Sequence, residues 1–219
     1  MADSLVNGNF KVLEKLVDLI NDYKHPLTWH GYARIDRRMT TTLLQKIGRS
    51  GCQFLSYGLE TGSQKVMDLM EKRTTVEEAR RVIRETFLSG VRVHLNMIVG
   101  FPGEDEKDFQ DTIEFLEEMS PYIHTVNTGE TCGIPMHTPL WDEPERFGIK
   151  TLEDGSIDWS SGSWESADGT SNETTRRGRL NSLRDFLDTK DHIVWFPRGP
   201  RPNQIYREPP SPLLNSVTL

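Results

Sequence analysis

The segment VRVHLNMIVGFPGEDEKDF, residues 91–109, decides the fold class of this chain. Its first ten residues are apolar at nearly every position, which is typical of a β-strand buried on both faces, as in a parallel sheet flanked by helices. A Pro-Gly turn and acidic residues follow, and they lead into a helix whose apolar stripe ends at Pro121. A buried strand that turns directly into an amphipathic helix indicates an α/β fold.

The same strand–helix order repeats on both sides of this segment. Asn9, Thr40 or Thr41, and Thr75 stand where helix N-caps are expected, and Gly51 and Gly90 where helices end. The connections are long enough for right-handed crossovers between parallel strands, so the pattern predicts either an α/β barrel or an open α/β sheet. We predict strands at 28–36, 52–60, 91–100 and 124–129, and helices at 10–22, 40–51, 63–71, 75–90, 104–120 and 176–188.

The strand–helix rhythm fails after about residue 129. The stretch 131–149 and the Ser/Gly/Asp-rich stretch 154–175 have the composition of loops, and the tail 196–212 is rich in proline. We therefore predict a division into residues 1–128, a partial barrel, and residues 129–219, an irregular extension of loops, one helix and a proline-rich tail.

Bulk composition limits the classes of partner. The formal net charge is -7 and the sequence pI is about 5.4, with no basic block to bind a phosphate backbone, so nucleic acid is not expected as a partner. No apolar run approaches the roughly 20 residues needed to cross a bilayer, and the first residues do not form a leader, so we expect no membrane association and a cytoplasmic location.

Polar and glycine-rich groups follow three of the predicted strands. Because the carboxyl ends of parallel strands meet at one edge, these groups are expected to form a shared ligand-binding mouth. The alternative is that they are ordinary strand–helix turns, with a solvated carboxylate at a helix N-terminus. The groups are Arg34 and Asp36 after the first strand, Gly58, Glu60 and Gly62 at the second, and Asn96 with Gly100–Glu104 at the third.

Two segments at these strand ends resemble a known family. FLSYGLETGSQKVMDLMEKRTT (54–75) and GVRVHLNMIVGFPGEDEKDFQDTIEFL (90–116) are similar to the second half of the catalytic barrel of radical S-adenosylmethionine (SAM) enzymes. More narrowly, they resemble the group that carries an N-terminal cobalamin-binding domain. DSLVNGN (3–9), RID (34–36), TPLWDEPERFGI (138–149) and W-x-S-x-D-G-x-x-N (164–172) extend the resemblance over most of the chain. The resemblance implies an incomplete TIM-type (β/α) barrel of about four parallel strands.

The resemblance also implies roles for individual residues. Glu60 would lie beside the ribose or the methionine amino group of SAM, and Lys72 would meet the SAM carboxylate. Asn96 would hydrogen-bond a ribose hydroxyl, and the backbone around Gly100 and Phe101 would hold the adenine.

Arg34 would reach the same mouth. The alternatives are that Lys72 belongs to a solvated charge run, that Asn96 is satisfied by backbone, and that Arg34 forms a surface ion pair.

The chain departs from the family in its cysteines. The family holds a [4Fe-4S] cluster with three closely spaced cysteines, whereas this chain has only Cys52, which we expect to pack in a strand, and Cys132, which we expect to be a free thiol. No metal ligand and no catalytic residue is assigned. The family's cluster and cobalamin would then need the missing N-terminal barrel portion and cobalamin domain, so the chain alone is not expected to cleave SAM.

Two functional interpretations stay open. The chain is either a fragment of a cobalamin-dependent radical SAM enzyme that contributes SAM-binding and substrate-side elements, or a non-catalytic ligand-binding or interaction module derived from that barrel. A dinucleotide-binding enzyme is disfavoured because the chain lacks the G-x-G-x-x-G turn. Without the first barrel strands, residues 28–36 would form an unpaired edge, which predicts self-association.

Overall fold

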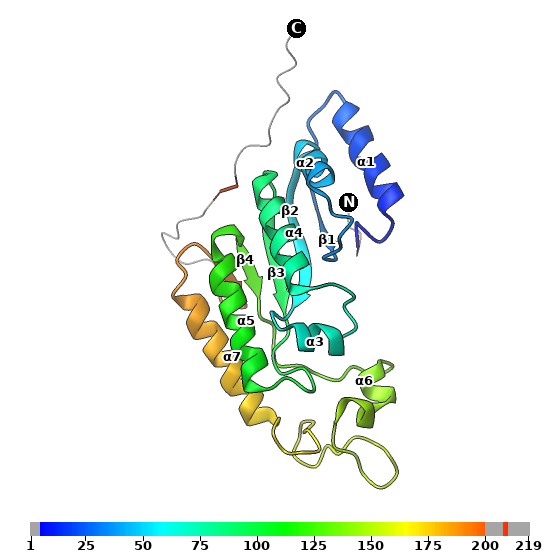
Figure 1. Cartoon of the computed structure of the whole chain (residues 1–219), viewed down its shortest axis with the longest axis vertical. Coiled ribbons are helices and arrows are strands. Elements are labelled where there is room, and N and C mark those ends of the chain that lie inside the picture. The colour runs from blue at the N-terminus through cyan, green and yellow to red at the C-terminus, as the bar shows by residue number, and fades with distance from the viewer. Residues whose placement is uncertain (1–4, 200–207, 210–219) are drawn as a thin grey trace.

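The computed structural model describes residues 5–199 and 208–209 and contains one parallel sheet with helices packed on it (Figure 1). Within these residues the sheet has five strands, hydrogen-bonded in the order of the sequence, and every neighbouring pair is parallel. The strands are β1 (Trp29–Ala33), β2 (Cys52–Glu60), β3 (Arg92–Met97), β4 (Thr125–Asn127) and β5 (Val194–Phe196).

The strand order identifies a TIM-type arrangement. Doubly wound sheets reverse their strand order and carry helices on both faces, whereas a barrel adds each strand beside the last and keeps its helices outside. Here the order is sequential, and one face of the sheet packs against the helices (Figure 1). The sheet is an open segment of a (β/α) barrel, as predicted. The covering helices are α2 (Thr41–Arg49), α4 (Val76–Leu88), α5 (Glu106–Met119) and α7 (Glu173–Asp188).

Side chains that the sequence identified as caps start the helices. Asn9 accepts from the Val12 amide at the start of α1 (Phe10–Asp22), Thr40 caps α2 and Thr75 caps α4. Ser63 caps the short helix α3 (Gln64–Leu69) in the same way. The predicted caps at Asn9, Thr40 and Thr75 are confirmed, and with Ser63 they fix where each strand–helix connection ends.

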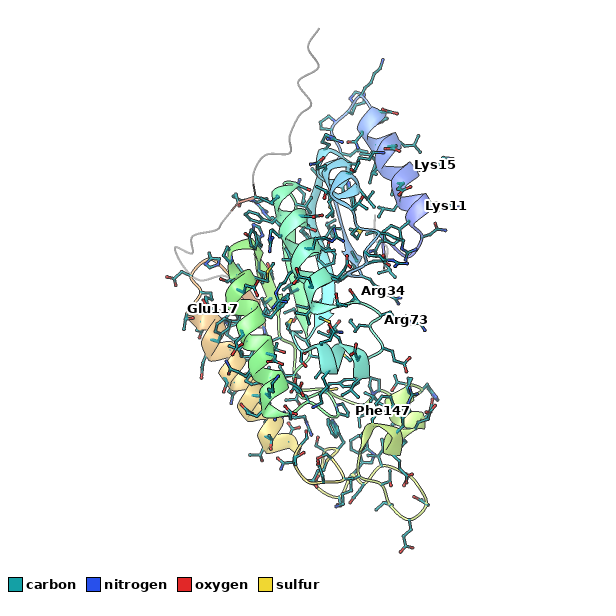
Figure 2. The ribbon with its side chains drawn as sticks, in the orientation of Figure 1. Lys11, Lys15, Arg34, Arg73, Glu117 and Phe147 are labelled. Atoms are coloured by element: carbon teal, nitrogen blue, oxygen red, sulfur yellow. The ribbon has the colours of Figure 1, made fainter. Side chains whose placement is uncertain are left out.

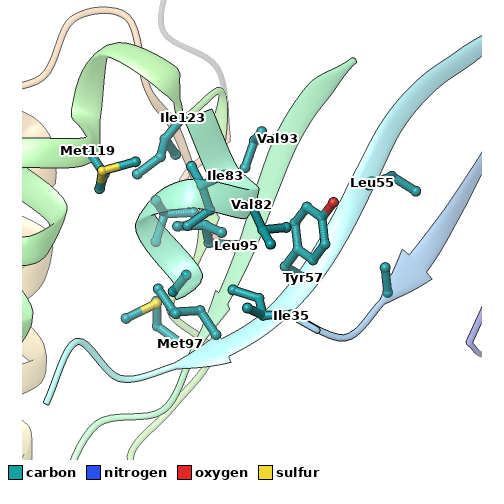
Figure 3. Packing of buried hydrophobic residues seen from close by; sticks show 14 of the residues in the cluster. Ile35, Leu55, Tyr57, Val82, Ile83, Val93, Leu95, Met97, Met119 and Ile123 are labelled. Atoms are coloured by element: carbon teal, nitrogen blue, oxygen red, sulfur yellow. The ribbon is translucent and has the colours of Figure 1, made fainter. Parts of the chain in front are cut away.

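The main core lies between the sheet and its helices. Alternate residues of β3, Val93, Leu95 and Met97, are buried against α4, which contributes Val82 and Ile83 (Figure 3). The intervening residues of β3 therefore point to the opposite face of the sheet. None of the described helices combines the length and the apolar character that crossing a membrane requires.

The opposite face of the sheet is partly exposed. His30, Phe54 and His94, from three adjacent strands, form a continuous stack with ring centroids 4.5 and 4.1 Å apart. Tyr32 on the same face keeps 56% of its surface exposed. In a closed barrel this face would line the interior.

Strand β1 lies at the edge of the sheet, as the sequence predicted, but part of its outer edge forms hydrogen bonds with residues 6 and 7. The Val6 amide donates to the Tyr32 carbonyl (2.8 Å). The Asn7 side chain accepts from the Arg34 amide (2.9 Å) and donates to the Arg34 carbonyl (2.8 Å). These residues cover the end of the edge nearest the strand's carboxyl terminus, and self-association through the edge stays a prediction.

The C-terminal part is more ordered than its composition indicated. The sequence did not predict β5, which adds a fifth strand to the expected four, or the second core of apolar residues between 132 and 164. Most of the predicted irregular tail, 200–207 and 210–212, lies outside the described residues. The short elements in this part are α6 (Pro139–Asp142) and η2 (Pro144–Phe147), and a further short element, η1 (Ser120–Tyr122), precedes β4.

Candidate functional site

The carboxyl ends of β1, β2 and β3 meet at one rim, and Glu60 stands at its centre. A register shift between Gly58 and Glu60 bends the end of β2, and the Glu60 carbonyl accepts from the Ile98 amide at 2.9 Å. Glu60 itself takes the left-handed conformation, with φ of 72°. This backbone conformation, which is uncommon outside glycine, aims the carboxylate along the rim.

Glu60 forms an ion pair with Lys72, with 3.6 Å between the carboxylate oxygen and Nζ. The two side chains are only 19% and 25% exposed. Burial raises the pKa of Glu60 against the opposing effect of Lys72, and burial lowers the pKa of Lys72 against the opposing effect of Glu60. Each side chain stabilises the charged form of the other. A ligand that brings a positive group to Glu60 and a negative group to Lys72 would therefore be favoured here.

The pair lies between two adjoining hollows. The larger, the Glu60–Lys72 cleft, has a volume of about 370 Å³, within the range of small-molecule sites. The smaller, of about 210 Å³, is lined by Arg34, Gly58 and Lys72. Figure 2 shows Arg34, Arg73 and Phe147 along the same side of the molecule. The walls of the larger cleft include Glu60, Lys72, Ile98, Phe101, Leu140 and Phe147.

Backbone strain concentrates around this cleft. Among the described residues, the non-glycine residues with positive φ are Glu60, Glu71, Arg73 and His137. Glu60 and Glu71 line the cleft, Arg73 follows Lys72, and His137 precedes a lining residue. Such conformations cost on the order of 1–3 kcal/mol each and gather at functional sites, so their grouping supports a ligand site here.

Asn96 lies on the open face of the sheet, beside Gly58 in the strand register. Its side-chain amide donates to the Ser56 hydroxyl at 3.1 Å, and its oxygen accepts from Asn127 at 3.3 Å. The structure therefore places Asn96 on the prospective barrel interior rather than in the wall of the Glu60–Lys72 cleft.

Gly100 and Phe101 lie in different surroundings. The Gly100 amide donates to the Glu104 carboxylate at 2.8 Å, and a Cβ at this position would approach the Arg176 side chain to 2.4 Å. Phe101 lines the cleft and meets Phe147 edge to face, with 6.3 Å between ring centroids. Phe101 therefore offers an aromatic surface, whereas the Gly100 backbone is occupied by Glu104.

Glu104 is a buried acid that the sequence placed among the strand-end groups without giving it a role. It pairs with Arg179 at 3.4 Å, yet burial raises the pKa of Glu104 to about 7. The folded chain then binds this proton more tightly than the unfolded chain, so the contribution to stability is full below about pH 4 and is lost as the pH rises through about 7.

We expect the free energy of unfolding to fall by about 1 kcal/mol or more between pH 5 and pH 8 because of Glu104. Urea unfolding at several pH values measures this slope. Glu104→Gln should flatten it, whereas Glu106→Gln, at a side chain that is 78% exposed, should leave it unchanged. An equal slope in the Glu104→Gln variant would contradict the assignment.

The loop after β4 supplies further parts of the site to which sequence reasoning assigned no individual role. Trp164 is 1% exposed, and its indole Nε1 donates to the Cys132 carbonyl at 2.7 Å. Arg176 stacks on Trp164 with 3.9 Å from its guanidinium carbon to the ring centroid. This cluster anchors the loop that brings Leu140 and Phe147 to the cleft. The sequence signal for these residues was the family resemblance of segments 138–149 and 164–172.

The two cysteines do not form a metal site. Cys52 begins β2, at the end opposite Glu60, and Cys132 follows β4. Both are buried, and burial raises the pKa of each thiol, to about 12 for Cys132. No group of three His, Cys, Asp or Glu residues suited to a metal occurs in the part of the chain that the structure describes. These residues do not fit a [4Fe-4S] cluster, which needs thiolate ligands at one place.

An open segment of a TIM-type barrel with a cleft at the carboxyl ends of its strands defines the class of this protein. The family model of the Radical SAM superfamily matches residues 6–116. The chain therefore belongs to the radical SAM superfamily, as its strand-end motifs predicted.

Curated relatives match shorter stretches of the chain. The tRNA-2-methylthio-N(6)-dimethylallyladenosine synthase of Buchnera aphidicola subsp. Schizaphis graminum is 36% identical over 69 residues, 31% of this chain and 16% of the relative. The ribosomal protein uS12 methylthiotransferase RimO of Pelotomaculum thermopropionicum is 29% identical over 111 residues, 49% of this chain and 25% of the relative. The chain thus spans a quarter or less of the length of these two relatives.

Solved structures share the fold. The radical SAM methyltransferase TsrM from Kitasatospora setae, with cobalamin and a [4Fe-4S] cluster bound, has a TM-score of 0.58 at 15% identity over 70% of this chain and 33% of that chain. Coproporphyrinogen III oxidase (HemN) from Escherichia coli has a TM-score of 0.55 at 15% identity over 87% of this chain and 41% of that chain. At these identities the likeness concerns the fold alone.

Proposed function

We propose that this chain binds SAM at the Glu60–Lys72 cleft and forms the SAM-binding and substrate side of a radical SAM enzyme. The observation that carries the proposal is the half-buried Glu60–Lys72 pair at the strand rim, set among strained residues in a cleft of about 370 Å³.

The chemistry of the cleft suits SAM. A carboxylate at Glu60 is matched to the methionine ammonium group, and the Lys72 ammonium is matched to the methionine carboxylate. The ring of Phe101 offers a surface for the adenine, and the turn at Gly100 supports that ring. Arg34 adds positive charge in the adjoining hollow, and Asn96 is proposed to meet the ribose from the barrel interior.

The rest of the enzyme is proposed to come from outside these residues. A [4Fe-4S] cluster bound outside these residues would supply the electron for reductive cleavage of SAM, since the two buried cysteines here do not hold such a cluster. The half-exposed sheet face, the edge position of β1 and the exposed Val12 and Leu19 of α1 support a further polypeptide segment that completes the barrel. Alone, the chain is proposed to bind SAM without cleaving it.

The kind of radical SAM enzyme is a finer proposal. The segments 3–9, 138–149 and 164–172 favour the cobalamin-dependent group. The curated relatives, named as a tRNA-2-methylthio-N(6)-dimethylallyladenosine synthase and a ribosomal protein methylthiotransferase, favour methylthio transfer as a second candidate. The coding sequence before Met1 discriminates between them. An upstream cobalamin-binding domain supports the first, and a cluster motif without that domain supports the second. Absence of both would favour the non-catalytic module.

Isothermal titration of the full chain with SAM tests the binding proposal. Glu60→Gln and Lys72→Met should each weaken SAM binding by about 10-fold or more, because each removes a charge-assisted contact. Glu77→Gln and Lys107→Met are matched controls, since their side chains are 82% and 83% exposed on helices away from the cleft. Failure of the wild-type chain to bind SAM, or unchanged binding in both cleft variants, would sink the proposal.

A further inference from the structure

A second cleft lies on the other side of helix α6. It has a volume of about 650 Å³ and is larger than the Glu60–Lys72 cleft. Trp141 of α6 and Trp159 of the following loop form two of its walls, with ring centroids 6.4 Å apart and planes tilted by 33°. Leu152 and Ile157 complete the apolar lining. We call this hollow the tryptophan cleft.

The exposure of its two indoles has no structural cause in the described part of the chain. Trp141 and Trp159 are 37% and 42% exposed, whereas Trp164 of the same segment is buried, hydrogen-bonded and stacked under Arg176. Leu152 at the rim is 51% exposed. Large apolar side chains gathered around a hollow are typical of a binding site rather than of a packed core.

The carboxylate of Asp158 and the serine groups of the cleft already have partners. Asp158 accepts from Lys150 at 2.9 Å and from the Ser160 amide at 2.9 Å. The Ser156 amide and hydroxyl both donate to Asp154. A charged ligand would therefore lose its hydration without gaining a free counter-charge.

We propose that the tryptophan cleft binds a planar, uncharged ring system. The two tilted indole faces favour an aromatic ring, because offset and edge-to-face contacts stabilise such pairs beyond the area that they bury. That this ring is part of the enzyme's substrate rests on the proposed function.

Helix α6 supports this connection. Pro139 and Leu140 line the Glu60–Lys72 cleft, and the next residue, Trp141, lines the tryptophan cleft. The two hollows therefore share a wall that is one short helix thick. A substrate whose ring is anchored by the tryptophans could extend past α6 toward the cofactor side, so the tryptophan cleft would set which substrates are accepted.

Two matched fluorescent probes test the cleft in the full chain. N-phenyl-1-naphthylamine is uncharged and carries a planar naphthalene ring, and 8-anilino-1-naphthalenesulfonate is the same ring system with a sulfonate. With direct excitation of the probe, we expect saturable binding of the uncharged probe, at least about 10-fold tighter than the sulfonate. Trp141→Ala and Trp159→Ala should each weaken it by about 10-fold.

Tyr32→Ala is the matched control, because Tyr32 is an exposed aromatic residue on the open sheet face. It should leave probe affinity unchanged. Loss of binding in Tyr32→Ala but not in the tryptophan variants, or tighter binding of the sulfonate, would overturn the proposal. Glu60→Gln should retain probe binding, so a failure of SAM binding is distinguishable from a failure of this cleft.

Discussion

Replacement of Gly48 by alanine is expected to destabilise the fold by about 2 kcal/mol. Gly48 lies in the last turn of α2, and a Cβ there would lie 1.9 Å from the Ser89 carbonyl oxygen at the end of α4. That oxygen belongs to the backbone, so the two helices must separate. Overpacking costs up to about 3 kcal/mol, and the better helix propensity of alanine returns at most about 1 kcal/mol.

Gly178→Ala is the matched control for this experiment. Gly178 is also inside a helix, α7, but nothing lies within 4 Å of a Cβ at that position. Alanine should therefore stabilise the chain by about 0.5–1 kcal/mol. Urea unfolding followed by far-UV circular dichroism measures both changes. A Gly48→Ala variant as stable as Gly178→Ala would show that the α2–α4 contact is not tight.

Arg176→Leu is expected to cost about 3 kcal/mol of unfolding free energy. The Arg176 side chain is 0% exposed and donates to the Trp164 carbonyl at 2.8 Å and to the Ser163 hydroxyl at 2.9 Å. Leucine would leave these acceptors buried without a donor and would remove the cation from the Trp164 ring. Tryptophan fluorescence during urea unfolding should report the loss around Trp164.

Arg177→Leu provides a close comparison, since both arginines pair with Glu173. Arg177 is 65% exposed, so solvent screens its ion pair and its loss should change stability by less than about 0.5 kcal/mol. Similar effects of the two substitutions would mean that the buried contacts of Arg176 contribute little.

The main sheet could be predicted from the sequence because its signals are local. The caps at Asn9, Thr40 and Thr75 and the apolar run of β3 each occupy a short stretch of chain. Strand β5 could not be predicted, because it is three residues long and stands next to a proline-rich stretch. It is stabilised by pairing with β4, about 70 residues earlier in the chain.

The candidate site was predictable only in part. The sequence placed Arg34, Glu60, Lys72 and Phe101 at one mouth, and the structure brings them to two adjoining hollows. At the end of β2 the left-handed conformation falls on Glu60 itself rather than on the flanking Gly58 and Gly62.

Gly62 is needed because helix α5 lies close to its backbone. A Cβ there would lie 2.8 Å from the Thr112 Cα on α5.

The second core could not be predicted from the sequence, because Ile149, Ile157 and Trp164 meet through long-range contacts without helical or strand periodicity.

The shared wall between the two clefts has a thermodynamic consequence. Leu140 and Trp141 are consecutive residues of a one-turn helix, so any displacement of α6 by an occupant on one side changes the shape of the hollow on the other. Occupancy of either hollow would then alter affinity at its neighbour, and linkage requires the effect to be equal in both directions. The four residues of α6 would then couple the binding of a molecule in one cleft to the binding of a molecule in the other.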